Sequence, residues 1–275
     1  MSIMTITSNT FVSAFLTNIN GNKKTFDDYI EFGEKLLSLE NIYKVIFIEK
    51  YIYDKYYSTI EYSHPNNHFV FIEKKDNYLY EHYDKITEYS LITDNVEKDT
   101  IDYMFFQCHK TEWVKQAIDI NPFNTEQFLW IDFSIYHIIR NDDLFKEYMT
   151  NISNYTNPTN HVKIGGCWDI NNTVYWHNRD FYKRIFWYFA GGLFGGNKEK
   201  MVLFSNLMRD KCIQIINEQK SIMWEVNIWY LIYWDNKDLF TSYYCGHDTY
   251  MLLNYYNEPC YYTPNLSNLS NLSNL

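Results

Sequence analysis

Asp132 is the first residue whose type and position could do chemistry. It ends the apolar run FLWID, residues 128–132, and a buried strand that ends in Asp places a carboxylate at the mouth of a sheet. Carboxylate oxygens are hard ligands that bind divalent cations. No second acid follows closely, because Phe133 and Ser134 come next. The alternative is that Asp132 caps the turn after the strand.

A glycine cluster in the segment FAGGLFGGN, residues 189–197, is the second candidate. The chain has only nine glycines, and four of them lie in this segment. Glycine tolerates positive φ and has no side chain, so the backbone N–H groups of a glycine loop can reach sugar hydroxyls or phosphate oxygens. The cluster is neither a G-x-G-x-x-G fingerprint nor a P-loop. The alternative is a tight connection between a buried aromatic strand and the next helix.

Two further side chains could take part. Glu225 lies among apolar residues in a helix predicted over 223–234, where a partly desolvated carboxylate can act as a base, a nucleophile or a stabiliser of a sugar cation. His247 follows a glycine turn in YYCGHDTY, and imidazole binds manganese and similar ions. The alternatives are a first-turn Glu favoured by the helix dipole and an ordinary surface or core histidine.

The first third of the chain predicts how such groups are positioned. Apolar, β-branched segments predict strands at 10–16, 44–49 and 68–73. A helix capped by Thr25 and a helical stretch at 51–57 separate them. Strand and helix in alternation predict an α/β fold with a mostly parallel central sheet flanked by helices. Ligands of such sheets bind beyond the carboxyl ends of the strands.

The rest of the chain continues the same pattern. The predicted elements are a mostly helical region at 76–120, a strand at 127–131, an Asn-rich loop at 150–160, a short strand at 161–164, and helices at 198–218 and 223–234. One domain over residues 1–262 and a low-complexity, disordered tail over 263–275 are expected.

Composition excludes some functions. The formal net charge of −10 and the isoelectric point near 5.3 argue against a general nucleic-acid binder, although a local basic pocket remains compatible with them. No stretch approaches the roughly 20 apolar residues of a membrane-spanning helix, and the N-terminus lacks the features of a signal peptide. A cytoplasmic location is therefore expected.

The cysteines also indicate an intracellular protein. They are odd in number, widely spaced, and form no C-x-x-C pair, which predicts reduced thiols and no zinc site. They are Cys108, Cys167, Cys212, Cys245 and Cys260.

Taken together, several stretches resemble the HtrL/YibB-type family of glycosyltransferase-like proteins. They are TFVSAFLTNI, KTEWVKQAIDINPFNTEQFLWIDFSIYH, FAGGLFGG, WEVNIWYLIYWDNKDLFTSYY and GHD, and they run from about residue 10 to about residue 250. The chain is also similar, more distantly, to blood-group-type glycosyltransferases, in which an F-G-G loop precedes a W-x-D-E motif.

The resemblance implies a single GT-A-like domain that moves a sugar from a nucleotide-diphosphate donor, UDP above all, to a hydroxyl of a glycan, lipid or protein acceptor. It also implies Mn²⁺ or Mg²⁺ as the cofactor. The oligomeric state stays open.

The family pattern also implies roles for residues of this chain. Asp132 would be the metal carboxylate of a reduced D-x-D whose second position is Ser134, His247 a late metal ligand, and Glu225 the catalytic carboxylate. The residues expected at the nucleotide and sugar are Thr17, Lys110, Gly191, Gly192, Gly195, Gly196 and Trp224.

Two departures from the family pattern leave alternatives open. Ser134 replaces the second acid, so metal binding through fewer charges, a weak enzyme and a metal-independent enzyme are all compatible with the sequence. Only Glu225 remains at the W-x-D-E position, so retaining and inverting chemistry are both compatible with it as well. One rival is an inactive GT-A shell that binds carbohydrate or a partner. The other is a structural or host-interaction protein.

Overall fold

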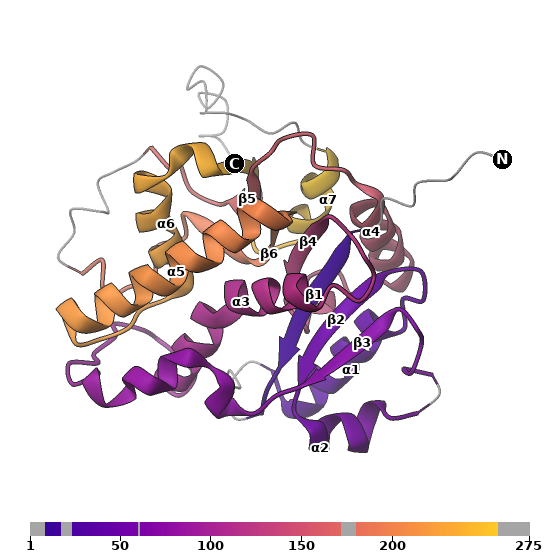
Figure 1. The fold of residues 1–275 in the computed structure, drawn as a ribbon, viewed down its shortest axis with the longest axis horizontal. Helices are drawn as coiled ribbons and strands as arrows, with labels where there is room; N and C mark the ends of the chain where they lie inside the picture. Colours follow the sequence, from indigo (N-terminus) through magenta and orange to yellow (C-terminus); the bar gives the residue numbers. More distant parts are fainter. Residues whose placement is uncertain (1–8, 18–23, 60, 172–179, 258–275) are drawn as a thin grey trace.

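The computed structural model describes residues 9–17, 24–59, 61–171 and 180–257 (Figure 1). The predicted tail at 263–275 and the domain boundary at 262 lie outside these residues, as do Cys260 and the first eight residues. The described elements pack on one central sheet. The predicted α/β class, a single domain with a central sheet flanked by helices, is confirmed.

The sheet has seven strands in the order β3-β2-β1-β4-β6-β5-β7. Four of the six strand pairings are parallel, while β6 runs antiparallel to both of its neighbours. The expected mostly parallel sheet is therefore confirmed, and its two antiparallel pairings are those of β6. The strands are β1 Thr10–Phe15, β2 Tyr43–Ile48, β3 Asn67–Phe71, β4 Gln127–Ile131, β5 Val162–Gly166, β6 Phe189–Asn197 and β7 Phe240–Tyr244.

The first helix begins where a local signal places it. Thr25 caps the first helix and forms a capping box with Asp28, as its sequence position predicts. Within the described residues, no helix combines the length and apolar character needed to cross a membrane. The helices are α1 Phe26–Leu37, α2 Lys50–Ile52, α3 Ile101–Ile120, α4 Asp142–Asn154, α5 Lys198–Gln219, α6 Glu225–Asp235 and α7 Tyr250–Asn257.

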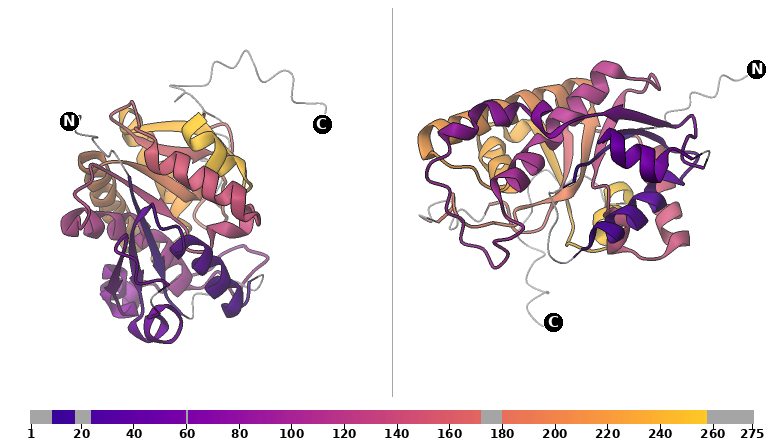
Figure 2. Two further views of the ribbon diagram at one scale, coloured as in Figure 1. Left: turned by 90° about the vertical axis from the view of Figure 1, so that its right-hand side faces the viewer. Right: turned by 90° about the horizontal axis from the view of Figure 1, so that it is seen from below.

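Each face of the sheet buries its own core. Val45 and Phe47 of β2 join a cluster with α3, α5 and α6, whereas the alternate residues Ile46 and Ile48 join a second cluster with α1, α4 and α7. Side chains alternate between the faces of a strand, which is why one strand supplies both clusters. Figure 2 shows the resulting three layers.

The glycine segment is a strand, so the prediction of a glycine loop is wrong. It forms β6, and none of the glycines that the structure describes has a positive φ. Close packing explains the small residues instead. A Cβ on Gly195 would lie 2.6 Å from the Phe128 carbonyl oxygen, and one on Gly196 would lie 2.9 Å from that of His161. Both glycines let β6 fit between β4 and β5.

Other elements differ from the sequence prediction. The region 76–120 is helical only in part, because residues 86–100 are irregular between a 3₁₀ segment, Tyr78–Lys85, and α3. The predicted loop at 150–160 begins inside α4, which Asn141 caps. Two elements after residue 239, β7 and α7, were not predicted.

Lys44 is an unusual core residue. It lies in β2 with no exposed surface, and its ammonium donates to the Leu39 carbonyl oxygen. Burial lowers the pKa of Lys44 to about 7. In the unfolded chain, the pKa of Lys44 would be about 10.4.

We predict that Gly195→Ala destabilises the fold by about 1–3 kcal/mol, because the new methyl group would overlap the backbone of β4. Gly166→Ala in β5 is the matched control, since its Cβ would have no neighbour closer than 3.6 Å. Urea unfolding of both variants measures the difference. Equal stability of the two variants would contradict the packing explanation.

Lys44→Met should make the fold more stable at pH 7, and the gain should depend on pH. Between pH 7 and about 10 the unfolded wild type holds a proton that the folded wild type has lost, so wild-type stability rises with pH. The advantage of the variant should therefore shrink by up to about 1.4 kcal/mol per pH unit above pH 7. Urea unfolding at pH 7 and pH 9 tests this, and a constant difference would contradict it.

Candidate functional site

The candidate site lies where the order of the strands reverses. The chain runs from β1 outward to β2 and β3, then returns to place β4 on the other side of β1. The reversal of strand order lies between β1 and β4, and the region beyond the carboxyl ends of such strands is the usual ligand position in open α/β sheets. Two adjoining hollows open there, with volumes of about 120 and 210 Å³.

A buried ion-pair network forms the floor of this region. The ammonium of Lys110 lies 3.1 Å from Asp132 Oδ1, 3.1 Å from Glu225 Oε1 and 3.0 Å from the Gly191 carbonyl oxygen. The Lys110 side chain is only 2% exposed. Burial acts to lower the pKa of Lys110, but the two carboxylates outweigh it and raise the pKa above its ordinary value. Lys110 is thus a fixed cation between two acids.

Four elements position these groups. Lys110 lies in the middle of α3, Asp132 directly follows β4, and Glu225 is the first residue of α6, where the helix dipole favours a carboxylate. Gly191 leaves the space, since a Cβ there would lie 2.3 Å from Glu225 Oε1.

A departure from strand register turns the backbone of β6 toward the site. Phe194 pairs with Ile164, but Ala190 pairs with the very next residue, Gly165. The intervening residues bulge, as strands often do beside functional sites. In this bulge the Gly192 carbonyl accepts a hydrogen bond from the Asp132 N–H at 3.0 Å, beside the Gly191 carbonyl that Lys110 contacts.

The larger hollow, which we call the carboxylate cleft, brings together most of the site predicted from sequence. The predicted site residues that line it are Lys110, Asp132, Gly191, Gly192, Trp224, Glu225 and His247. The expected convergence of the Asp132 carboxylate, the glycine backbone, Glu225 and His247 is therefore present. The roles of these residues remain predictions.

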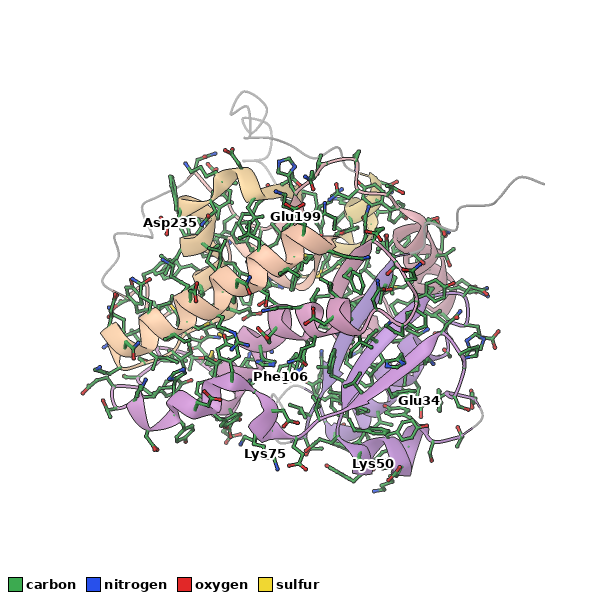
Figure 3. All side chains as sticks on the ribbon, in the orientation of Figure 1. Glu34, Lys50, Lys75, Phe106, Glu199 and Asp235 are labelled. Atoms are coloured by element: carbon green, nitrogen blue, oxygen red, sulfur yellow. The ribbon has the colours of Figure 1, made fainter. Side chains whose placement is uncertain are left out.

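The smaller hollow, which we call the aromatic cleft, adjoins the first. Its walls include Phe15, Tyr29 and Trp130, with Phe106 of α3, which is labelled in Figure 3. Four residues line both hollows, namely Lys24, Tyr103, Gln107 and Asp132. An extended ligand could thus place a flat ring in one hollow and a polar group in the other.

Lys24 is a site residue that the sequence prediction missed. Its ammonium donates to Ser134 Oγ at 3.0 Å and lies 3.0 Å from His137 Nδ1. Burial lowers the pKa of Lys24 to about 8, against the opposite effect of the Asp132 charge. Ser134 lines the aromatic cleft and is buried.

His247 borders the carboxylate cleft from the segment after β7. Its ring lies against Trp187, with 4.2 Å between the ring centroids. Hydrogen bonds with Cys245 and with His247 lower the pKa of the Cys167 thiol to about 6, and the bond with Cys167 raises the pKa of His247. The imidazole is therefore paired with a thiol.

Three predicted site residues lie apart from the two clefts. Gly195 and Gly196 pack between strands of the sheet and line neither hollow. Thr17 binds Glu49, whose Oε2 accepts from the Thr17 N–H at 2.6 Å and from its hydroxyl at 2.7 Å. Its neighbour Leu16, rather than Thr17, lines the aromatic cleft.

The residues do not fit a ready-made metal site. Asp132 Oδ1 already accepts a hydrogen bond from Trp130 Nε1 at 2.8 Å and pairs with Lys110. Ser134 contacts the ammonium of Lys24, and His247 contacts a thiol. Within the part of the chain that the structure describes, no three His, Cys, Asp or Glu residues converge to hold an ion. The expected Mn²⁺ or Mg²⁺ stays a prediction.

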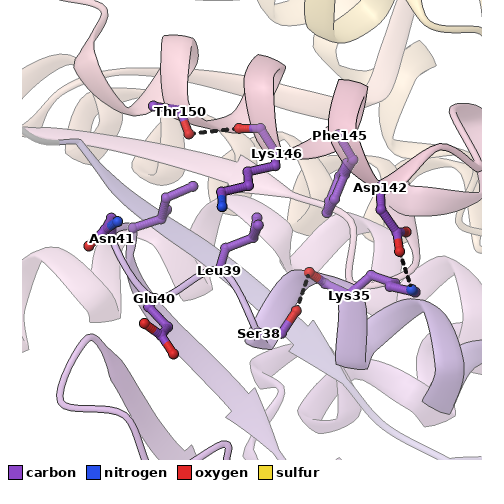
Figure 4. A pocket seen from close by; sticks show the side chains of 10 residues that line it. Lys35, Ser38, Leu39, Glu40, Asn41, Asp142, Phe145, Lys146 and Thr150 are labelled. Atoms are coloured by element: carbon purple, nitrogen blue, oxygen red, sulfur yellow. Dashed lines mark hydrogen bonds and ion pairs between the residues drawn. The ribbon is translucent and has the colours of Figure 1, made fainter.

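A third hollow, of about 410 Å³, lies between α1 and α4 (Figure 4). Its charged groups include Lys146 and the ion pair of Lys35 with Asp142, whose atoms are 2.7 Å apart. The two partners of this pair are 35% and 63% exposed, so water screens them. The two clefts therefore remain the better candidate site, although they are smaller.

Several solved structures are similar to this chain. Mouse xyloside xylosyltransferase 1, in its apo form, is 12% identical with a TM-score of 0.42, over 86% of this chain and 84% of that one. The galactosyltransferase LgtC, in complex with donor and acceptor sugar analogues, is 9% identical with a TM-score of 0.46, over 85% and 72%. The 4-diphosphocytidyl-2C-methyl-D-erythritol synthase of Anaerococcus prevotii is 10% identical with a TM-score of 0.41, over 86% of each chain.

Among curated proteins there is no significant match. A family model does match, over residues 7–251, and this range contains all the residues of both clefts. Its description is "Bacterial protein of unknown function (HtrL_YibB)". The chain belongs to the HtrL_YibB family.

Proposed function

We propose that the chain is a glycosyltransferase of the GT-A type, which moves a sugar from a nucleoside-diphosphate donor to a hydroxyl acceptor. One observation carries this proposal: Asp132, Glu225, Gly191, Gly192 and His247 line a single cleft at the strand-order reversal. The resemblance to glycosyltransferase-like proteins predicts that these residues lie together.

The two adjoining hollows could together hold the base, the diphosphate and the sugar of a nucleotide-sugar donor. Tyr29 and Phe106, the half-buried rings of the aromatic cleft, offer surface against which a base could stack. The carboxylate cleft offers carboxylates and backbone carbonyls that accept hydrogen bonds from sugar hydroxyls. Lys24 and Asp132 line both hollows, where the diphosphate between base and sugar would lie.

Glu225 is the proposed catalytic carboxylate. Transfer breaks the bond from the anomeric carbon to the β-phosphate oxygen, whose electron pair leaves with the nucleoside diphosphate. The acceptor oxygen forms the new bond and loses its proton. A carboxylate on the cleft wall can take that proton or stabilise the positive charge that develops on the sugar. Lys110 holds this carboxylate in place at 3.1 Å.

The contacts of Asp132 favour a second candidate function. In it, the chain is a carbohydrate- or partner-binding protein that has lost catalysis. Asp132 Oδ1 is tied to Lys110 and Trp130, and no second acid follows. Such a protein would bind a nucleotide or sugar without consuming a nucleotide sugar. The two candidates thus differ in turnover.

The proposed function is tested by measuring the nucleotide released from UDP-, GDP- and CMP-sugars, once with Mn²⁺ and once with a chelator. We expect one donor to be consumed, and Glu225→Gln to lower its consumption by at least about 100-fold, because a positioned acid or base contributes that much. The amide oxygen of Gln can still accept from Lys110, so the fold should persist.

The matched control is Glu126→Gln. Glu126 precedes β4, at the opposite end of the strand from Asp132, and its 80% exposed side chain pairs with Lys198. Its replacement should leave activity within about twofold, because exposed ion pairs contribute little. No donor consumed under any metal condition would contradict the proposed function. Equal activity of wild type and Glu225→Gln would remove Glu225 from the catalytic role.

A further inference from the structure

Lys24 lies at the boundary that the aromatic and carboxylate clefts share. Its nearest polar partners are the Ser134 hydroxyl and the His137 ring, both at 3.0 Å. Within the part of the chain that the structure describes, no carboxylate lies within ion-pair distance of the Lys24 ammonium. The Asp132 charge acts on Lys24 only from beyond contact distance, so this partly buried ammonium has lost water without gaining a contact ion pair. A bound anion would supply that counter-ion.

The other charged groups around this boundary already have partners. Lys110 pairs with both Asp132 and Glu225. Lys98, on the wall of the carboxylate cleft, lies 3.3 Å from Asp99 Oδ1. Among the lysines that line the carboxylate cleft in the described part of the chain, Lys24 is therefore the one whose charge is least compensated.

The same arrangement disfavours a divalent ion at Asp132. An ion there would approach Lys110, whose ammonium lies 3.1 Å from Oδ1, and would also approach Lys24, whose charge interacts with Asp132. Like charges at such distances repel strongly in a partly buried site. The one expected metal carboxylate is thus already paired with a lysine.

We propose that Lys24 binds the diphosphate of the donor and supplies the positive charge that the family pattern assigns to a metal ion, so that donor binding does not depend on a divalent cation. This inference rests on the proposed function for the identity of the donor. The Lys24 ammonium would donate charge-assisted hydrogen bonds to the phosphate oxygens. Lys24 keeps its proton throughout, because the leaving charge stays on the nucleoside diphosphate.

Calorimetric titration tests the proposal with two probes, UDP and inorganic pyrophosphate, each in EDTA and in Mn²⁺. For the wild type we expect UDP affinities in the two conditions to agree within about threefold. Lys24→Met should weaken both probes in EDTA by about tenfold or more, the loss expected for a charge-assisted hydrogen bond. Lys24→Arg, which keeps the charge, should recover most of the affinity.

Lys115→Met is the matched control, since it removes one positive charge from α3 outside both clefts, where Lys115 contacts Asn206 at 2.9 Å. It should bind both probes as the wild type does. Melting temperatures of all variants establish that they fold. Binding that requires Mn²⁺, or a Lys24→Met variant that binds as tightly as Lys115→Met, would overturn the proposal.

The outcome separates this inference from the proposed function. Donor consumption that requires Mn²⁺ and is unaffected by Lys24→Met would overturn the role of Lys24 and leave the transferase standing. Metal-free pyrophosphate binding that depends on Lys24, without consumption of any nucleotide sugar, would support the anion site and count against the transferase.

Discussion

The buried ammonium of Lys110 is the constraint on which the candidate site depends. A lysine that is 2% exposed needs nearby carboxylates to remain charged, and here they come from two elements, the end of β4 and the start of α6. The same ammonium also needs a close backbone carbonyl, which only a residue without a side chain can bring so near. Removing Lys110 would leave the buried Glu225 carboxylate without its counter-ion. The network therefore fixes α3, β4, β6 and α6 relative to one another.

Much of the local structure could be predicted from sequence, because it depends on neighbours along the chain. The cap at Thr25 and the strand that leads into Asp132 are readable from residue types at element ends, and the helix predicted over 223–234 is observed over Glu225–Asp235. Since functional groups in α/β folds gather at the carboxyl ends of strands, those end positions also predicted which residues would meet in the carboxylate cleft.

What the sequence did not predict depends on contacts between distant segments. The glycines of β6 could equally have formed a loop, and only their pairing with β4 and β5 shows that Gly195 and Gly196 serve packing. Lys24 belongs to no recognisable sequence motif, and its hydrogen-bond partner Ser134 lies 110 residues away in the chain. A residue defined by such a contact has no local signal. Strand pairing decides which face and which cleft a side chain reaches.

The overall charge of the chain gives little indication of what its cleft can bind. A formal charge of −10 would repel an anionic ligand at long range, but salt screens exposed charges beyond about 8–10 Å. Within that range the cleft has its own balance, in which Lys110 compensates two acids only in part and Lys24 faces neutral partners. An anion that reaches the shared boundary of the two clefts therefore meets a local cation in a partly desolvated setting, where attraction is strongest. Local pairing, rather than net charge, therefore sets the field inside the cleft.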